Sequence, residues 1–365
     1  MTDEPLRGGP VEGPVIIARG WLDELERRAE AGLPAHVREY IATTAGTAGR
    51  AARDLGEWDA VSFAPRTLLG EQSLALDTTV LGRPVSLPVL VAPMAQQVAA
   101  DPAGERATGA AAASIGTVLG VSTNTAVPFE DIRATGADWW FQVYPLANRD
   151  ATARLVERAA AAGASAIILT VDTTALLVSA PGVEPTEWPE GPERERLVNL
   201  TAVERAALTG RPTLPASISD IAWLSEISGG LPVIVKGVLR GDDATRAVEA
   251  GAAAVVVSTH GGRRSGASIT SLAALPSVVA AVGEEAEVYV DSGIRSGGHV
   301  LAALALGARA VFVGRPVMWG LATEGRAGVE RVLSGFRAEL ELALAQSGAT
   351  SLDRLRSELD VTLGL

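Results

Sequence analysis

The chain has 365 residues, of which 47% are hydrophobic and 20% charged, and its formal net charge at pH 7 is −12. The negative charge argues against nucleic acid and against an anionic membrane surface, because both partners attract clustered Lys and Arg. The absence of cysteine excludes disulfides, thiol nucleophiles, thiolate metal sites and Cys-ligated iron–sulfur clusters.

The first 85 residues are expected to form a helical extension. Residues 1–20 are rich in Gly and Pro and show no apolar region typical of a signal peptide. Apolar residues at helical spacing predict a helix over Trp21–Ala31 and a second one after Pro34, whereas Thr43–Gly56 is either loop or helix. Because no run of about 18 apolar residues occurs, we expect a cytoplasmic protein that does not span a membrane.

From Leu87 onward, short apolar runs alternate with Ala-rich amphipathic stretches. Such alternation indicates a parallel sheet with crossover helices. Eight units favour an α/β fold of the (β/α)8 TIM-barrel type over the alternative, an open doubly wound sheet. We expect a single domain, with the extension at 1–85, the barrel at 86–320 and C-terminal helices at 321–365. The eight runs are Val89–Ala92, Thr117–Val121, Trp139–Val143, Ala166–Val171, Pro232–Val235, Ala254–Val257, Glu287–Val290 and Ala310–Val313.

One connection is much longer than the others. More than forty residues separate Asp172 from the helix expected near Ser219, and they include six prolines and many charges. A loop of this length is either a lid or a disordered insertion. After the eighth run, Gly325–Gln346 is predicted to be the closing helix and Leu352–Leu359 a short final one.

Polar or small residues follow each run at the point where its apolar stretch ends. The carboxyl ends of barrel strands share one face, so these residues are expected to line one pocket. The last two ends, DSGIR at 291–295 and GRP at 314–316, supply Gly amides and two Arg, which suits a phosphate. The alternative is that both Arg are surface charges. The strand-end residues are Pro93, Met94, Ala95, Ser122, Thr123, Gln142, Tyr144, Thr170, Asp172, Lys236, Ser258, His260, Arg263, Asp291, Ser292, Gly293, Arg295, Gly314 and Arg315.

Two of these positions carry titratable groups of special interest. Lys236 ends the apolar run PVIVK and needs either an electron-rich ligand or a structural partner, for which Asp172 and Asp291 are candidates. His260 follows a strand end beside two Gly, and a carboxylate such as Asp172 would orient its imidazole and raise its basicity. The other histidines, at positions 36 and 299, fall on predicted helices and are interpreted as structural. Three scattered His without ligand spacing argue against a metal site.

Seven motifs together resemble the FMN-dependent α-hydroxy-acid oxidase and dehydrogenase family, which includes glycolate oxidase and lactate oxidase. In chain order they are LPVLVAPMA, FQVY, LTVDT, LPVIVKGVL, VVVSTHGGR, VDSGIRSG and FVGRPV. The likeness extends from about Leu33 to Leu352. The family folds as a (β/α)8 barrel, in agreement with the count of apolar runs.

The resemblance implies a role for each motif. Lys236 would stabilise negative charge at the N1–O2 edge of the flavin, and His260 would be the catalytic base, supported by Asp172. Arg263 would bind the substrate carboxylate, and Tyr40, also counted among the catalytic residues, would donate a hydrogen bond to it. Tyr144 would be a further substrate-binding residue. The remaining positions would bind FMN, namely Ala92, Pro93, Met94, Ala95, Ser122, Gln142, Thr170, Ser258, Asp291, Ser292, Gly293, Arg295, Gly314 and Arg315.

The chain departs from the family pattern around the substrate. Ser179 stands where the family has a second carboxylate-binding Arg, and Leu146 stands where it usually has a Tyr. Losing one charge-assisted contact with the carboxylate costs about 1.5–3 kcal/mol. Arg194 or Arg196 of the long loop could supply the missing contact. Smaller departures are Thr259, where Asn is usual, and the Arg-Ser-Gly that follows Arg263.

We therefore expect an FMN-dependent oxidoreductase that converts the C–OH of a 2-hydroxy acid to a 2-oxo acid. The alternative is the same fold acting on a larger biosynthetic substrate by C–OH or C–N oxidation, as the mycofactocin-maturing relatives suggest. A flavin-binding protein without catalysis is a third possibility. The partners expected are a small-molecule substrate that bears a carboxylate, in view of Arg263, and O2 or another electron acceptor. The family resemblance also implies a homo-oligomer, often a tetramer.

Overall fold

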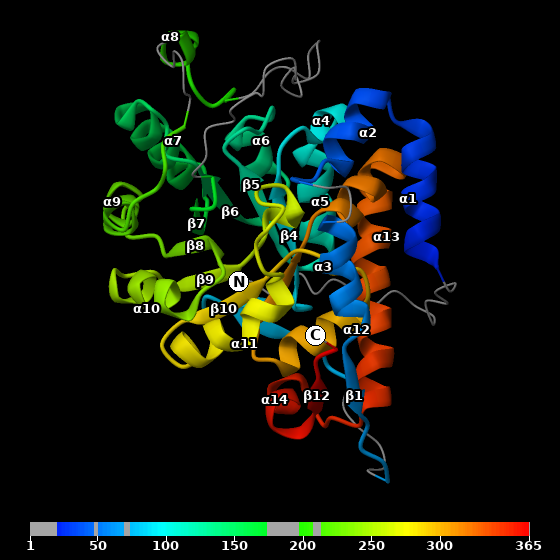
Figure 1. Ribbon diagram of the computed structural model, residues 1–365. Coiled ribbons are helices and arrows are strands. Elements are labelled where there is room, and N and C mark those ends of the chain that lie inside the picture. The colour runs from blue at the N-terminus through cyan, green and yellow to red at the C-terminus, as the bar shows by residue number, and fades with distance from the viewer. Residues whose placement is uncertain (1–19, 47–49, 69–73, 174–196, 207–212, 365) are drawn as a thin grey trace, which may run out of the picture.

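The computed structural model describes residues 20–46, 50–68, 74–173, 197–206 and 213–364. Within these ranges, eight parallel strands close into a barrel in the order β10-β11-β4-β5-β6-β7-β8-β9 (Figure 1). The predicted TIM barrel is confirmed, and each predicted run supplies one strand. The strands are β4 (Val89–Met94), β5 (Val118–Ser122), β6 (Asp138–Val143), β7 (Ala166–Thr170), β8 (Val233–Val238), β9 (Ala254–Val257), β10 (Glu287–Val290) and β11 (Ala310–Val313).

Alternate residues of each strand belong to two different hydrophobic clusters, as the period of two in a strand requires. In β6, Trp140 joins the cluster inside the barrel, whereas Trp139 joins the outer cluster beneath the helices. The inner cluster centres on Trp140, Tyr289 and Phe312, whose ring centroids lie 5.6–6.0 Å apart. Small residues such as Ala166 and Ala254 share this interior. The apolar runs are therefore buried on both faces, which explains their lack of polar alternation.

Helices follow the strands and cover the outside of the barrel (Figure 1). Short α8 (Ala202–Ala206) belongs to the long connection after β7. The last helix changes direction at Glu324 and Gly325, where the backbone is not helical, so the predicted helix from Gly325 forms its second part. The covering helices are α4 (Gln97–Ala100), α5 (Glu105–Ile115), α6 (Phe129–Ala134), α7 (Arg149–Ala161), α9 (Ser219–Ile227), α10 (Gly241–Glu249), α11 (Ser271–Val282), α12 (Gly297–Ala305) and α13 (Arg315–Ser347).

The N-terminal extension forms α1 (Trp21–Gly32), α2 (Ala35–Ala42) and α3 (Arg50–Asp59). Helix α1 lies along α13, where the ring of Trp21 meets Phe336 edge-on at 6.3 Å. Helix α3 packs against α11 and the short helix η2 (His260–Gly262), which follows β9. The undecided segment Thr43–Gly56 therefore contains both loop and helix, and its helix contacts a loop at the barrel mouth.

The strand that follows α3 meets the C-terminal segment in the lower part of the molecule (Figure 1). Strand β1 (Ser62–Ala64) pairs antiparallel with β12 (Asp360–Thr362), after η3 (Leu352–Arg354) and α14 (Leu355–Glu358). The hairpin of β2 (Thr78–Val80) and β3 (Arg83–Val85) adds apolar side chains to the inner cluster.

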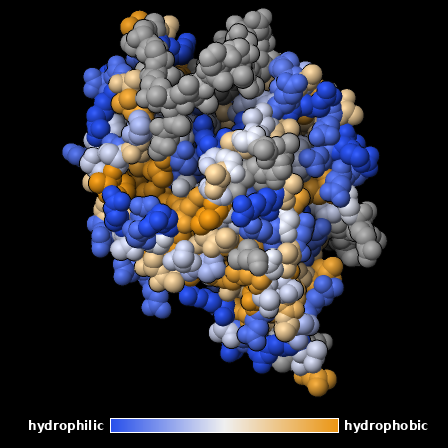
Figure 2. All heavy atoms as spheres, viewed as in Figure 1, coloured by the Kyte–Doolittle hydropathy of each residue, from blue (hydrophilic) through white to orange (hydrophobic). Residues whose placement is uncertain are grey.

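Figure 2 shows hydrophilic side chains around the margin of the face seen in Figure 1 and hydrophobic side chains in its middle. No helix among the described residues is long and apolar enough to cross a membrane.

Candidate active site

His260 and Asp172 meet at the carboxyl end of the barrel, although 88 residues separate them in the chain. His260 Nδ1 lies 3.0 Å from both Oδ1 and Oδ2 of Asp172. Asp172 follows β7, and a Cβ on neighbouring Gly237, which has φ +110, would lie 2.8 Å from Asp172 Cβ. Gly237 therefore gives Asp172 the room to reach His260. The geometry agrees with the predicted pair.

The pKa values of Asp172 and His260 are shifted in directions that suit proton transfer. Burial tends to raise the pKa of Asp172, but the hydrogen bond and charge of His260, helped by Lys236, bring that pKa below its ordinary value. Burial lowers the pKa of His260 and outweighs the opposing effect of Asp172. At neutral pH the imidazole is therefore neutral and the carboxylate ionised. An ionised Asp172 accepts the Nδ1 proton, which leaves Nε2 as the basic nitrogen.

Lys236 is buried at the end of β8, with 5% of its surface exposed. Its Nζ lies 2.8 Å from Asp291 Oδ2 and donates to Ser258 Oγ at 2.8 Å. Burial alone would lower the pKa of Lys236, but the carboxylates of Asp291 and Asp172 reverse this and raise it. Of the two structural partners considered from the sequence, Asp291 makes the direct ion pair. The result is a permanent cation held inside the mouth.

A chain of hydroxyl and amide groups crosses the ends of β5, β6 and β7. Ser122 Oγ donates to Gln142 Oε1 at 3.3 Å, and Gln142 Nε2 donates to Thr170 Oγ1 at 3.0 Å. Across the barrel, a Cβ on Gly314 would contact Met94 Sδ at 3.4 Å and Ala92 Cβ at 3.7 Å. The predicted cofactor positions on these strands therefore surround one space, with polar groups along one side. Pro93 and Ala95 lie at the end of β4, and Ser258 follows β9.

Arg295 and Arg315 are both partly buried, which argues against the alternative that they are surface charges. Burial and the charge of Arg315 lower the pKa of Arg295 to about 10, and burial and Arg263 lower the pKa of Arg315. Arg295 lies over the ring of Trp319 at 5.1 Å. Arg315 lies close enough to repel both Arg295 and Arg263, and this concentration of guanidinium groups favours an anionic ligand. The phosphate and carboxylate expected from the sequence both satisfy this electrostatic requirement.

The loop that carries Arg295 depends on close contact with α3. A Cβ on Gly293, which has φ +89, would lie 2.7 Å from Trp58 and 2.8 Å from the Asp54 carbonyl oxygen. His299 Nδ1 accepts from the Arg295 amide at 3.2 Å, and its Nε2 lies 3.0 Å from Asp59 Oδ1. His299 is a structural residue, as interpreted from the sequence. Its contacts hold the predicted phosphate loop in place.

The side chain of Arg263, which follows η2, contacts the C-terminal end of α2. Its Nη1 donates to the carbonyls of Tyr40 at 2.6 Å and Thr43 at 3.2 Å, and its guanidinium lies 4.8 Å from the Tyr40 ring centroid. Arg315 donates to the same Thr43 carbonyl at 3.3 Å. Tyr144 is close enough to influence the pKa of both Arg263 and Lys236. The predicted substrate residues therefore share one corner of the mouth.

The structure describes some of the residues at which the chain departs from the family pattern, but not all of them. Leu146 is 2% exposed and belongs to the main hydrophobic core, and its backbone pairs with Thr213 where the long connection returns. Thr259 Oγ1 donates to Asp54 Oδ2 at 2.9 Å. The residues after Arg263 are exposed. Ser179, Arg194 and Arg196, and with them the question of a lid, lie outside the described residues.

Sequence reasoning missed three residues that support the site from the extension and α12: Asp54, Trp58 and His299. Asp54 and Trp58 are four residues apart on α3 and both are buried. That spacing on an amphipathic helix indicates a packed face. Nothing in the sequence indicates that the face packs against the His260 loop.

Comparison with known proteins agrees with this geometry. The family model described as FMN-dependent dehydrogenase matches residues 29–361. The L-lactate oxidase of Nostoc sp. is 40% identical, with 91% of this chain and 95% of that protein covered. The pre-mycofactocin synthase of Mycobacterium tuberculosis is 36% identical, covering 93% and 94%. A crystal structure of mandelate oxidase has a TM-score of 0.81 at 36% identity, covering 94% of this chain and 98% of that chain.

The chain belongs to the FMN-dependent dehydrogenase family. It is a flavoprotein oxidoreductase of the 2-hydroxy-acid oxidase type, and its cofactor is FMN. The buried cations, the polar strand ends and the close approach that Gly314 permits fit such a group. FMN, when bound, takes the two electrons released as C–OH becomes C=O.

Proposed function

We propose that this protein oxidises a 2-hydroxy acid to the 2-oxo acid with His260 as the base. The observation that carries the proposal is the hydrogen bond between His260 Nδ1 and both oxygens of Asp172. This contact fixes the tautomer, leaves Nε2 free of Asp172 and places a negative charge beside the imidazolium that forms. Asp172 therefore stabilises His260 after it has taken a proton from the substrate.

The other residues bind and orient the substrate in this proposal. Arg263 binds the carboxylate, and the two nearby tyrosines, Tyr40 and Tyr144, donate hydrogen bonds to it. Lys236 would supply the positive charge that stabilises negative charge on the reduced cofactor. The cluster of Arg295 and Arg315 holds the cofactor phosphate, with Gly314 allowing close approach. Each role is the one that the family resemblance implies, and the charge and position of these residues at the mouth support it.

The proposal is tested by mixing the purified yellow protein anaerobically with a panel of 2-hydroxy acids and following flavin absorbance. We expect at least one member to bleach the flavin and to yield the 2-oxo acid in equal amount. Bleaching by amino acids or larger intermediates alone would contradict the proposal. Hydrogen peroxide released on readmitting air measures whether oxygen is the electron acceptor.

A second candidate is oxidation of a larger substrate at a C–OH or C–N bond. The observation that favours it is Ser179 at the position of the second carboxylate-binding Arg, together with similarity to pre-mycofactocin synthase. The substitution Ser179→Arg separates the two candidates. We expect it to improve turnover of lactate, glycolate or mandelate by roughly tenfold or more if one missing charge-assisted contact limits them. No gain would favour the larger substrate.

A further inference from the structure

Two residues with left-handed backbone lie next to each other at the mouth. His260 has φ 58 and Ser292 has φ 75, although neither is glycine. Non-glycine residues adopt this conformation only where surrounding contacts hold them in it. One of the two is the proposed base, and the other was expected from the sequence to bind the cofactor. The hydrogen bonds of Ser292 give its side chain a different task.

The Ser292 hydroxyl makes three hydrogen bonds, all within the protein. It accepts from the amides of Thr259 at 3.2 Å and Gly261 at 2.9 Å, the two residues that flank His260. It donates to Asp291 Oδ1 at 2.6 Å. A hydroxyl has one proton and two lone pairs, so all its hydrogen-bonding capacity is used. Because the proton points to the carboxylate, both lone pairs face the His260 turn.

The same contacts connect the His260 turn to Lys236. Asp291 Oδ2 pairs with Lys236 Nζ at 2.8 Å, and Lys236 donates to Ser258 Oγ at 2.8 Å. Ser258 Oγ in turn accepts from the His260 amide at 3.0 Å. The hydrogen bonds thus form a closed ring that runs from the proposed base to the buried cation and back through Ser292.

The backbone of Ser292 is held from the other side. Its carbonyl accepts from Trp58 Nε1 at 2.9 Å and from Ser271 Oγ at 3.0 Å. Trp58 belongs to α3 and Ser271 begins α11, so two helices fix this residue in its unfavourable conformation. A side chain held this firmly can act as a rigid support for the turn beside it.

We propose that Ser292 is a positioning residue that holds His260 against Asp172 through the amides on either side of it. The inference rests on the proposed role of His260 as base. Without the hydroxyl, two amides of a strained turn lose their acceptor and the turn relaxes. The imidazole then spends less time with Nδ1 bonded to Asp172, and proton transfer slows. The cofactor phosphate site keeps both of its arginines.

The test compares Ser292→Gly with Ser292→Ala. Both variants remove the hydroxyl, but Gly also relieves the left-handed backbone whereas Ala retains the strain. If Ser292 mattered only for folding, the Gly variant, in which the backbone strain is relieved, would be fully active. We expect both variants to bind FMN and to reduce it roughly 10- to 100-fold more slowly at saturating substrate, since small misplacement of a reacting group has effects of this size. We expect little change in KM.

A second readout does not depend on turnover. The chain has three histidines, so ¹⁵N-labelled histidine gives a spectrum that the His36→Gln and His260→Gln variants assign. In the wild-type protein at pH 8 we expect His260 to be fixed with its proton on Nδ1. We expect both Ser292 variants to show a mixture of the two tautomers.

Ser277→Ala is the matched control, because it removes a hydroxyl of the same helix α11 that donates to the Ala274 carbonyl and not to Ser292 or the His260 turn. It should leave the tautomer and the reduction rate unchanged. An unchanged tautomer in both Ser292 variants would overturn the inference, as would wild-type reduction rates. Loss of FMN with an unchanged tautomer would return Ser292 to cofactor binding. If no 2-hydroxy acid reduces the wild-type flavin, the proposed function fails, and the tautomer alone decides the role of Ser292.

Discussion

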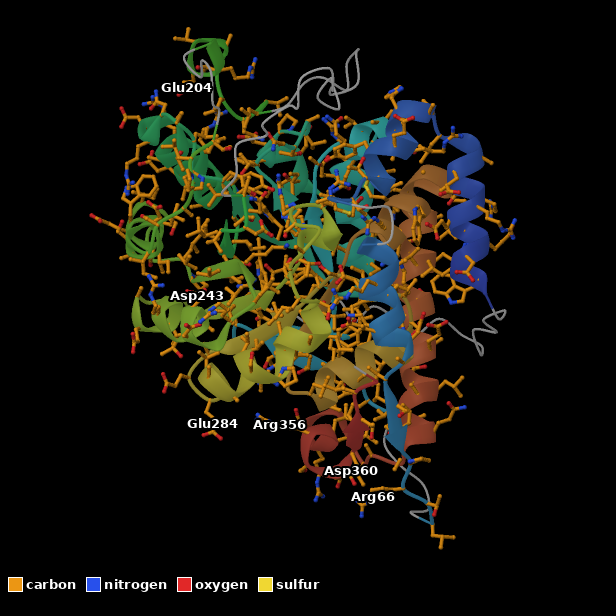
Figure 3. The ribbon with its side chains drawn as sticks, in the orientation of Figure 1. Arg66, Glu204, Asp243, Glu284, Arg356 and Asp360 are labelled. Atoms are coloured by element: carbon orange, nitrogen blue, oxygen red, sulfur yellow. The ribbon has the colours of Figure 1, made fainter. Side chains whose placement is uncertain are left out.

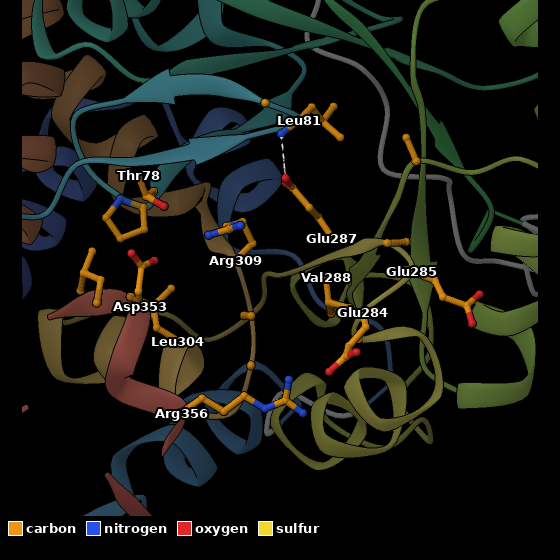
Figure 4. A pocket seen from close by; sticks show the side chains of 18 residues that line it. Thr78, Leu81, Glu284, Glu285, Glu287, Val288, Leu304, Arg309, Asp353 and Arg356 are labelled. Carbon is orange, nitrogen blue, oxygen red and sulfur yellow. Dashed lines mark hydrogen bonds between the residues drawn. The ribbon is translucent and has the colours of Figure 1, made fainter. Parts of the chain in front are cut away.

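The two ends of the barrel both carry charged side chains, but they use them differently. At the carboxyl end, Lys236, Asp291 and Asp172 are buried or nearly so and bonded to one another or to His260. At the opposite end, a cavity of about 480 Å³ lies among the starts of β9, β10 and β11 (Figure 4). Its charged residues include Glu284 and Arg356, which lie at the same edge of the molecule in Figure 3 and are exposed.

The difference shows that cavity size does not identify the reactive end. Charges that remain in water interact weakly, whereas charges at a buried mouth act strongly on one another and on a ligand. Glu287 at the lower cavity is partly buried and accepts from the Leu81 amide and the Tyr289 hydroxyl. These contacts fasten the β2–β3 hairpin to the barrel. The lower end therefore contributes stability, as is usual for this fold.

The largest effect is expected at the mouth from His260→Gln, which removes the base but keeps a polar side chain. We expect the rate of anaerobic flavin reduction to fall roughly 100- to 10,000-fold, the usual contribution of general base catalysis, with FMN still bound. The matched control is His36→Gln, on the exposed side of α2, which should keep the wild-type rate. Equal rates in the two variants would remove His260 from catalysis.

A buried acid near the mouth should make stability depend on pH. Glu105 begins α5 and is fully buried, and Thr125 and Arg106 offset only part of the effect of burial on its pKa. Burial raises its pKa from 4.5 to about 7. The folded state therefore holds a proton that the unfolded state releases between these values, so stability falls as pH rises through this window.

We expect Glu105→Gln, which cannot ionise, to be more stable than wild type at pH 8 by on the order of 3 kcal/mol, from about 1.4 kcal/mol per pKa unit. At pH 4, where Glu105 is protonated in both states, the difference should be small. Thermal or urea unfolding at the two pH values measures this. The exposed Glu285→Gln at the lower cavity should show no such pH-dependent gain.

Arg295→Gln tests the anion site. Losing one charge-assisted contact should weaken FMN binding by roughly 10- to 100-fold, from about 1.5–3 kcal/mol. Fluorescence of free flavin during dilution or dialysis measures the dissociation constant. Arg309→Gln is the matched control, because it removes an exposed arginine at the lower cavity, away from the mouth. Comparable losses in both variants would show that overall positive charge, rather than the geometry of the mouth, holds the cofactor.

The smallest expected effect is a shift in the pH profile. Because burial lowers the pKa of His260, the acid limb of kcat/KM should lie below the ordinary histidine value of 6.5. Protonation inactivates the base, so activity falls as pH decreases through that limb. Asp172 acts to raise the pKa of His260, so Asp172→Asn should move the limb to still lower pH as well as reduce the rate. A limb above 6.5 would contradict a buried neutral imidazole.

Much of the fold could be read from local patterns. The run from Ala254 to Val257 is apolar at every position, which indicates a strand covered on both faces, and the structure starts and ends β9 at these residues. The polar residues after each run could likewise be assigned to one face, because parallel strands place their carboxyl ends together. The motif order then indicated FMN and the candidate roles of His260, Arg263 and Lys236.

The partners of those residues were beyond prediction from the sequence. Lys236 could have paired with either carboxylate, and only packing brings Asp291 Oδ2 within 2.8 Å of it. Thr259 was a departure without explanation until α3 placed Asp54 beside it, 205 residues away in the chain.

The sequence by itself determined the eight-stranded barrel and the reactive face, because the period of apolar residues and the direction of parallel strands are local properties. Tertiary structure alone decided that α3 supports the His260 turn and that the Ser292 hydroxyl faces its amides. A hydroxyl donates and accepts in directions set by whichever groups surround it. Those groups come from segments far apart in the chain.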